Sequence, residues 1–303
     1  MIYSRYEKIL YYFVAISLVV FAIFPIYWTL ISSLKIPSEL INREPTYFPQ
    51  TITLEYYQNI WDVEVYLEKL YEKKNEGGQI RPEGFLPKGM NVIFLNSVYV
   101  SIGTIILTAF LSTFTGYAFA VFEFPFKKII YIIILLPIFI PVIVLVIPLY
   151  SLLKDLNLIN SYYSLILIHS ISLLPLGTFM MRNAFQSVPE SLKEIAVLEG
   201  SSEIRIIFNV MLPLALPGLL TVMVFAMWVS WGDFMMAFIF TTKAEMTSLN
   251  VALTNLARTG IANEIRWGNL MAGSMVSFIP IILFYVFMQK YFVRGITASA
   301  VKE

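Results

Sequence analysis

Cysteine is absent from the 303 residues of this chain, and histidine occurs once. Without cysteine the chain has no disulfide bonds, thiolate metal sites or cysteine nucleophiles, although the redox compartment stays undecided. A single histidine cannot complete a metal site on its own. We therefore expect this chain to bind no cofactor. We interpret His169, which lies in a long apolar run, as a buried hydrogen-bonding residue rather than a proton relay.

Charged residues are also scarce, because Asp, Glu, Lys and Arg make up 14% of the chain, against about 25% in ordinary soluble proteins. The net charge of +1 argues against a surface for nucleic acid or acidic substrates. Neither the P-loop motif nor the His-Glu-x-x-His motif of zinc proteases occurs. An intramembrane aspartyl protease needs two carboxylates that share a proton, and only Asp233 lies clearly within an apolar run. These absences predict that the chain is not an enzyme.

Apolar residues, in contrast, make up 58% of the chain, with 24 Phe and 18 Tyr. A transmembrane helix needs about 20 apolar residues, and six runs reach that length. They are Ile9–Leu34, Val92–Phe122, Ile129–Leu153, Leu156–Met181, Leu212–Thr241 and Asn269–Gln289. The first run is too long for a signal-peptide core, so we expect it to be a retained anchor. The sequence therefore predicts an all-α, multi-pass protein of the plasma (inner) membrane with six transmembrane helices.

Six crossings put both termini on the same side of the membrane, and the short loops favour the cytoplasm for that side. Lys127 and Lys128 follow the second run, whereas Lys154 after the third run is offset by Asp155. The expected division has four parts: 1–34, the N-terminal cytoplasmic end and first helix; 35–89, an extracytoplasmic loop; 90–292, a five-helix core; and 293–303, a cytoplasmic tail. The 35–89 loop contains a helical pattern from Tyr56 to Lys74, so we expect a small ordered cap there.

Asp233 is an ionisable residue in the fifth run, and such residues are functional candidates by default. Counted from Pro213, it lies about 30 Å along a helix that rises 1.5 Å per residue, which places it near the outer interface. Trp228 and Trp231 precede it. These two indoles either line a path for a sugar or belong to an interfacial aromatic belt, and we favour the belt.

A polar segment at 182–211 separates the fourth and fifth runs. Ser187 and Glu190 have the spacing of a capping box, with Pro189 in the first turn, which predicts the start of a helix. Gly200 would end that helix. Its apolar stripe includes Ile195 and Leu198, whereas the acids of the segment remain on the polar side. The pattern predicts a helix-turn-helix on the membrane surface that a partner can grip.

The motif Glu194-Ile195-Ala196, followed by Gly200 and by Leu212-Pro213, resembles the EAA loop of binding-protein-dependent ABC importer permeases. Ile195 replaces an alanine of the family pattern, and Glu199 stands where aspartate is usual. Other segments also resemble the family. They are Asn96-Ser97, Gly116-Tyr117-Ala118-Phe119-Ala120, Ile147-Pro148-Leu149-Tyr150, Met180-Met181-Arg182, Trp231-Gly232-Asp233-Phe234 and the ending from Gln289 to Lys302. This ending is similar to that of the maltose-type carbohydrate permeases.

The resemblance implies a type I ABC importer permease fold with a cytoplasmic coupling helix in the EAA loop, 183–213. It implies a homologous second permease, two ATPase subunits, an extracytoplasmic solute-binding protein and a sugar substrate as partners, with no nucleic acid. The 242–267 loop would reach the binding protein, and the C-terminal tail would touch the ATPases. The implied ATPase-coupling residues are Glu190, Glu194, Ile195, Ala196, Leu198, Glu199, Gly200, Leu212 and Pro213. Candidates for the translocation path or gate are Asn96, Trp228, Trp231 and Asp233.

Other functions stay open at this point. The first is a permease for another ligand of a binding protein, such as glycerol phosphate or an oligopeptide. The second is an ion-coupled secondary transporter, against which the lack of a second intramembrane carboxylate and of two matching halves counts. The third is an intramembrane hydrolase, for which no catalytic set is present. A requirement for ATP and a binding protein separates the importer from the last two.

Overall fold

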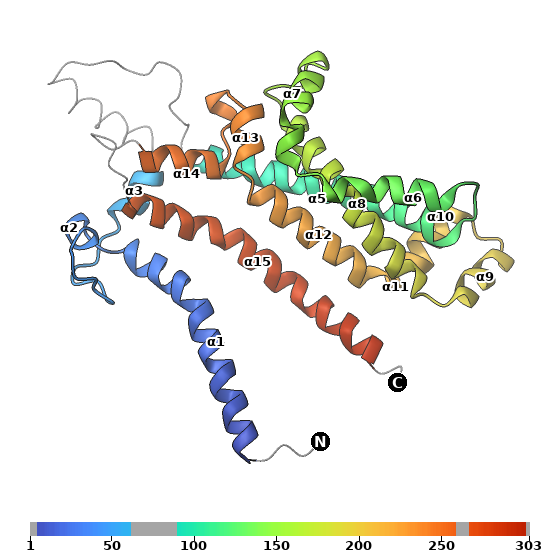
Figure 1. Ribbon diagram of the computed structural model, residues 1–303, viewed down its shortest axis with the longest axis horizontal. Helices are drawn as coiled ribbons and strands as arrows, with labels where there is room; N and C mark the ends of the chain where they lie inside the picture. Colours follow the sequence, from blue (N-terminus) through green and yellow to red (C-terminus); the bar gives the residue numbers. More distant parts are fainter. Residues whose placement is uncertain (1–4, 62–89, 259–266, 301–303) are drawn as a thin grey trace. The chain divides into compact units, whose positions relative to one another are not determined.

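The computed structural model describes residues 5–61, 90–258 and 267–300 (Figure 1). These ranges are mainly helical and contain no β-strand, only an isolated bridge between Lys35 and Ile52. The α-helices are α1 (Arg5–Ser32), α2 (Pro37–Leu40), α3 (Glu55–Trp61), α5 (Met90–Val121), α6 (Lys127–Leu135), α7 (Val146–Asp155), α8 (Tyr162–Gln186), α9 (Glu190–Leu198), α10 (Glu203–Ile206), α11 (Leu212–Leu214), α12 (Leu216–Trp231), α13 (Met235–Phe240), α14 (Leu249–Arg258) and α15 (Trp267–Ala300).

Four of the six predicted spans are single helices in the described chain. They are Lys8–Ser32, Met90–Val121, Tyr162–Gln186 and Trp267–Gln289. The fourth span begins later than predicted, because Ser161 is the N-cap of α8 and its side chain accepts a hydrogen bond from the backbone N–H of Tyr163. These helices confirm the predicted class of an all-α membrane protein.

The other two predicted spans are bent rather than single helices. The third run consists of Lys127–Phe139 and Val142–Asp155, which meet at 96°, and the fifth of Glu203–Leu214 and Leu216–Trp231, which meet at 83°. Proline has no N–H to donate and clashes with the preceding turn. Pro141 lies at the first break and Pro217 just after the second. Each bent pair can count as one span, which gives up to six crossings.

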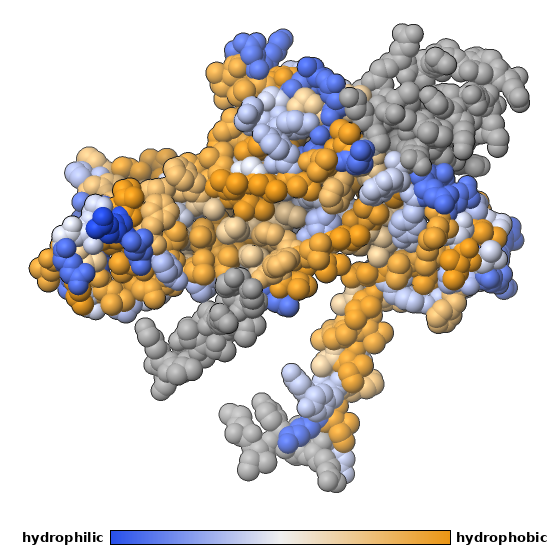
Figure 2. Space-filling model, turned by 180° about the vertical axis from the view of Figure 1, so that it is seen from behind, coloured by the Kyte–Doolittle hydropathy of each residue, from blue (hydrophilic) through white to orange (hydrophobic). Residues whose placement is uncertain are grey.

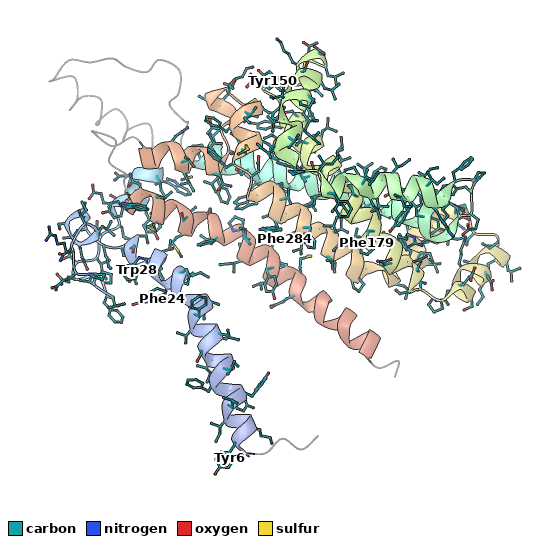
Figure 3. All side chains as sticks on the ribbon, viewed as in Figure 1. Tyr6, Phe24, Trp28, Tyr150, Phe179 and Phe284 are labelled. Carbon is teal, nitrogen blue, oxygen red and sulfur yellow. The ribbon has the colours of Figure 1, made fainter. Side chains whose placement is uncertain are left out.

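The described chain divides into two compact units. Unit 1 consists of Met1–Asn91 and Ala252–Ile279, and unit 2 of Val92–Val251 and Pro280–Glu303. In unit 1, α3 confirms the start of the predicted helical pattern in the 35–89 loop, and the rest of that pattern lies outside the described residues. Helix α1 exposes nearly all its apolar side chains, including Tyr6 and Phe24 (Figure 3), as expected for a helix surrounded by lipid or by another subunit.

Unit 2 is built around α8, which packs along α12. Its buried side chains form two clusters. The α9-end cluster consists of Tyr117, Met181, Phe185, Val188, Ala196, Ile206, Ile207, Met211, Ala215 and Val222. The α13-end cluster consists of Val100, Leu153, Leu165, Ile166, Ile168, Met236, Ala237, Phe240 and Val251. Tyr150 lies on α7 (Figure 3), and the centre of its ring is 5.8 Å from that of Phe240 in the second cluster. The two clusters fix the two ends of α8, and each end carries one group of candidate residues.

Candidate functional site

Helix α9 begins differently from the prediction. Ser187 has helical backbone angles and ends α8, and its hydroxyl donates to the carbonyl of Ala184 at 2.7 Å. The N-cap of α9 is Pro189, which makes no side-chain capping bond. The predicted capping box is therefore wrong. An N-cap serine needs an extended backbone to reach the next turn, and Ser187 instead has the helical backbone angles of the C-cap residue of α8.

The end of α9 confirms the role predicted for Gly200. Its φ angle is +76°, a left-handed conformation that glycine adopts without a steric penalty. The N–H of Gly200 donates to the carbonyl of Val197 at 2.9 Å, and the N–H of Ser201 to that of Ala196 at 3.0 Å. These two bonds are the Schellman arrangement, which satisfies the last carbonyls of a helix. The chain therefore reverses sharply at Gly200 toward α10.

The two faces of α9 have different surroundings. Ala196 is 6% exposed and packs in the α9-end cluster, so the small side chain at this position allows close approach to the chain's own core. Ile195 and Val197 are about half exposed, and Leu198 is 87% exposed. Of the implied coupling residues, Ala196 faces inward, whereas Ile195 and Leu198 are open to a partner. The open apolar edge consists of Ile195, Val197 and Leu198.

Polar residues surround this edge. The three acids of the predicted site, Glu190, Glu194 and Glu199, are all exposed. Hydrophilic residues gather at the end of unit 2 that carries α9 and α10, while the long sides of the unit are mostly apolar (Figure 2). Leu212 is half-buried and Pro213 exposed at the start of the following helices. An amphipathic helix at a polar end of a membrane protein is accessible to a soluble partner.

A polar contact that the sequence did not predict ties this segment to α5. The buried Tyr117 hydroxyl donates to Glu203 Oε2 on α10 at 2.6 Å. Lys193 Nζ on α9 lies 3.9 Å from Glu203 Oε1 and 5.5 Å from the centre of the Phe122 ring. Hydrogen bonds to an ionised carboxylate are stronger than neutral ones. Tyr117 was identified only as part of a motif, and no signal in the sequence paired it with Glu203.

The neighbouring ends of α5, α6 and α8 are joined around Arg182. Its Nε donates to the carbonyl of Phe119 at 3.3 Å, and its guanidinium lies 4.8 Å from the centre of the Tyr131 ring. Beside it, a Cβ on Gly116 would lie 2.4 Å from the Cβ of Met181. Only glycine permits this crossing of α5 and α8. The helix ends next to α9 therefore form one connected structure.

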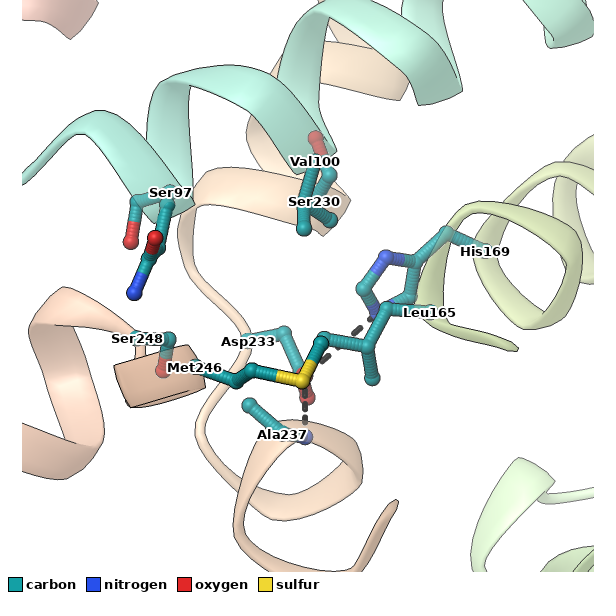
Figure 4. A pocket seen from close by; sticks show the side chains of 10 residues that line it. Ser97, Val100, Leu165, His169, Ser230, Asp233, Ala237, Met246 and Ser248 are labelled. Atoms are coloured by element: carbon teal, nitrogen blue, oxygen red, sulfur yellow. Dashed lines mark hydrogen bonds and ion pairs between the residues drawn. The ribbon is translucent and has the colours of Figure 1, made fainter. Parts of the chain in front are cut away.

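At the other end of unit 2, Asp233 is not within a helix, so its predicted place inside a span is wrong. Helix α12 ends at Trp231, and the Asp233 carboxylate accepts bonds from the N–H groups of Met236 at 3.1 Å and Ala237 at 2.8 Å. The carboxylate thereby provides acceptors for two N–H groups in the first turn of α13, which have no partner within the helix. His169 is buried as predicted, but the prediction that it forms hydrogen bonds is wrong, because neither ring nitrogen has a hydrogen-bond partner among the described residues. Its Nε2 lies 3.4 Å from Asp233 Oδ2 (Figure 4).

Asn96 is also engaged within the chain. Its Nδ2 donates to the carbonyls of Glu245 at 2.9 Å and Thr247 at 3.0 Å, and its Oδ1 accepts from the Tyr162 hydroxyl at 2.7 Å. It thereby holds the segment before α14 against α5 and α8. The sequence could not indicate these partners, because two of them are separated from Asn96 by 149 and 151 positions.

The two tryptophans before Asp233 have different surroundings. Trp231 is 4% exposed and meets the Phe94 ring edge-on at 5.6 Å, so the interfacial belt is the wrong interpretation for it. Trp228 is 66% exposed, and its role in a belt or a path stays a prediction.

A small cavity lies beside Asn96, His169 and Asp233. Its volume is about 10 Å³, and its lining includes Asn96, His169, Ser230 and Asp233 (Figure 4). A cavity of this size holds about one water molecule, and it is too small for a sugar. Within the described parts of the chain, no group of three or more His, Cys, Asp or Glu could hold a metal ion. The arrangement closes the α13 end of unit 2 with buried polar bonds.

Comparison with known proteins adds the family and the fold. Residues 112–298 match the family model described as "Binding-protein-dependent transport system inner membrane component". The probable ABC transporter permease protein YurM of Bacillus subtilis is 33% identical over 224 residues, which cover 73% of this chain and 74% of that protein. The arabinooligosaccharides transport system permease protein AraQ of Bacillus subtilis is 29% identical over 282 residues, which cover 92% of this chain and 90% of AraQ.

A solved structure supports the architecture. A chain from a bacterial ABC transporter involved in the import of the acidic polysaccharide alginate superposes with a TM-score of 0.74 and 19% sequence identity. The match covers 96% of this chain and 99% of that chain. The helices described above therefore have the fold of an ABC importer's membrane chain, and the predicted fold class is confirmed.

Proposed function

The chain belongs to the family of binding-protein-dependent transport system inner membrane components, and on that premise we propose that it is the permease subunit of an ATP-driven sugar importer. A solute-binding protein delivers a mono- or oligosaccharide, a homologous second permease completes the pore, and two ATPase subunits hydrolyse the ATP. This chain binds no cofactor and catalyses no reaction. The arabinooligosaccharides named for AraQ support a sugar as the substrate class.

One observation carries this proposal: α9 has an open apolar edge on a helix whose other face is fixed in the core. Leu198, at the end of that edge, is 87% exposed. Burying a leucine side chain yields about 1.5–3 kcal/mol, so a partner that covers it gains affinity. The exposed acids Glu190, Glu194 and Glu199 make an anionic membrane surface an unfavourable partner. A protein with an apolar cleft and a basic rim, here the ATPase, suits both features.

The connections of α9 support its role in coupling. Ala196 packs in the α9-end cluster, and Tyr117 binds Glu203 directly after the Gly200 turn. A displacement of α9 is therefore passed to α5 and α8, and from α8 to α12. Closure of the ATPase dimer would move these helix ends as a rigid body and switch access to the pore.

If α9 meets the ATPase, it lies on the cytoplasmic side of the membrane, and the other assignments follow from that orientation. Both termini lie in the cytoplasm, and the α13 end of unit 2 faces outward. Trp228 presents an exposed indole that can line the sugar path, whereas Asn96, Trp231 and Asp233 support the path by holding the outer helix ends together. The 242–267 loop, of which 242–258 and residue 267 are described, reaches toward the binding protein. The tail after the last span contacts the ATPases.

The test is a pull-down of the detergent-solubilised chain, as wild type and as the double variant Glu194→Lys, Gly200→Asp. The wild type is expected to recover an ATPase and a second permease, and the variant to lose only the ATPase. Glu44→Lys, an exposed charge reversal in the 35–89 loop, is the matched control and should keep both partners. A chain that purifies alone and moves solute in vesicles without ATP would be a secondary transporter, and the proposal would be wrong.

A further inference from the structure

Unit 1 contains a cavity of about 250 Å³ that is separate from the residues discussed so far. Its walls come from the end of α1, from α2 and the loop after it, and from the start of α15. The chemically distinctive groups in the lining are Trp28, Lys35, Glu39, Asn42 and Trp267. The volume is slightly below the roughly 300–1,000 Å³ of pockets for drug-sized ligands, which suits a ligand of one ring.

The walls of this cavity are held in place by bonds within unit 1. Lys35 is 2% exposed, and its Nζ donates to the carbonyl of Thr46. The Glu39 carboxylate accepts bonds from the Thr46 hydroxyl and from the backbone N–H of Gln50, the latter at 3.2 Å. The N–H of Thr53 donates to the carbonyl of Leu34 at 2.9 Å. The loop is therefore ordered before any ligand arrives, which lowers the cost of binding.

The charges of the lining favour a neutral ligand. The hydrogen bond from Thr46 lowers the pKa of Glu39 below its ordinary value of 4.5 by more than burial raises it, and the Gln50 N–H and the Lys35 charge lower this pKa further. Glu39 is thus ionised at neutral pH and balances Lys35. The Lys35 ammonium lies 4.7 Å from the centre of the Trp28 ring. The cation–π interaction of this indole is therefore already made within the chain. Neither a simple anion nor an organic cation finds an uncompensated charge here.

The aromatic groups of the cavity suit the C–H face of a sugar ring, and its polar groups suit the hydroxyl groups of the ring. Trp28 is held by Phe24 and Tyr47, each with its ring centre 6.0 Å away, and forms a fixed wall. Trp267 is 48% exposed and offers an indole against which the C–H face of a pyranose can pack. Asn42, Glu39 and Lys35 supply donors and acceptors for its hydroxyl groups. We propose that this cavity binds one neutral sugar ring on the outer side of the membrane, where the solute arrives.

This inference rests on the proposed function for its orientation and substrate class. The test uses the importer co-purified with its partner chains in nanodiscs, without ATP or binding protein. Saturation-transfer NMR would measure binding of the methyl α-pyranosides of glucose, galactose and mannose. The wild type is expected to bind at least one of them, and Trp267→Leu and Asn42→Ala to bind it about tenfold more weakly, as for the loss of one good contact. Trp61→Leu, an exposed tryptophan of unit 1 outside the cavity, should bind like the wild type.

Equal binding by all four proteins, or binding of none of the three glycosides by the wild type, would overturn the inference. Displacement of the glycoside by phosphocholine would also overturn it, in favour of a lipid headgroup. ATP-dependent uptake, measured separately in proteoliposomes with the binding protein, distinguishes the two proposals. The importer could bind a glycoside through Trp267 and Asn42 and yet transport no sugar. That result would refute the proposed transport function and support the proposed sugar-binding cavity. Sugar uptake without such binding would refute only the cavity.

Discussion

A side chain added at Gly200 would leave the packing of this chain unchanged and would affect only contacts with a partner. Its φ angle is +76°, and a Cβ added to it would have no neighbour within 4 Å. A non-glycine residue in this conformation costs about 1–2 kcal/mol, less for aspartate and asparagine, which adopt it more readily. The chain can therefore fold with Asp or Asn at this position, and any larger effect must come from a surface that approaches the turn.

We predict that Gly200→Asp abolishes uptake while the protein inserts into the membrane in normal amounts. The added carboxylate would lie on the surface that the ATPase covers, and burying an unpaired carboxylate there costs far more than burying a neutral amide. Gly200→Asn is the matched control, since it has the same shape without the charge, and it should retain more uptake. Transport by reconstituted vesicles and the yield in membranes are the measurements. Normal uptake by the aspartate variant would remove the turn from the coupling surface.

Tyr117 gives a second test at the scale of one residue. Tyr117→Phe removes the hydroxyl that donates to Glu203 at 2.6 Å and leaves the ring in place. A hydrogen bond to a charged group contributes about 1.5–3 kcal/mol, and we expect the lower end because Glu203 is 45% exposed. The thermal midpoint should fall, and uptake should fall even though the ATPase still co-purifies. Tyr11→Phe on exposed α1 should change neither, and an unchanged midpoint for Tyr117→Phe would show that this bond does not hold α10.

At the scale of elements, the crossing of α5 and α8 connects the α9 end to the rest of unit 2. Gly116 lets the two backbones approach, and Arg182 joins α8 to the end of α5 and to Tyr131 of α6. Buried neighbours allow little adjustment at such a crossing, because protein interiors are close-packed. The crossing is therefore the point at which a motion of α9 becomes a motion of whole helices.

We predict that Gly116→Val separates α5 from α8 and destabilises the protein by about 1–3 kcal/mol, the usual cost of overpacking. Its Cβ would meet the Met181 Cβ at 2.4 Å and the backbone of Arg182 at 2.9 Å, and backbone cannot move aside cheaply. Ile106→Phe adds volume on the exposed face of the same helix and is the control. Thermal unfolding in detergent measures both, and equal midpoints would mean that the crossing tolerates a side chain.

At the scale of the whole molecule, the lack of cysteine makes orientation directly testable. The wild-type chain has no thiol, so a single introduced cysteine reports its own side of the membrane without background. Ser38 in α2 and Glu123 in the loop after α5 are both exposed. The proposed topology puts the first outside and the second inside.

We expect a membrane-impermeant maleimide to label Ser38→Cys in intact cells and to label Glu123→Cys only after the membrane is opened. The reagent cannot cross the hydrocarbon core, so labelling reports the side of each site. Both variants should react equally in detergent, which controls for accessibility. The reverse pattern would invert the topology and place α9 outside, where no ATPase could reach it.

The sequence by itself determined the class and the family of this protein, because both depend on local features. The sequence alone shows the long apolar runs, the scarcity of charge and the short motif around Glu194 and Gly200. It also predicts the end of α9, since the left-handed turn there favours glycine. The breaks near Pro141 and Pro217 had a visible cause, but the size of the bends did not. Only the tertiary structure decided that Ala196 faces inward, that the Asp233 carboxylate accepts hydrogen bonds from the first turn of α13, and that Tyr117 binds Glu203. These outcomes depend on residues far apart in the chain, and a pattern along the sequence carries no information about which of many possible partners a buried polar group will meet.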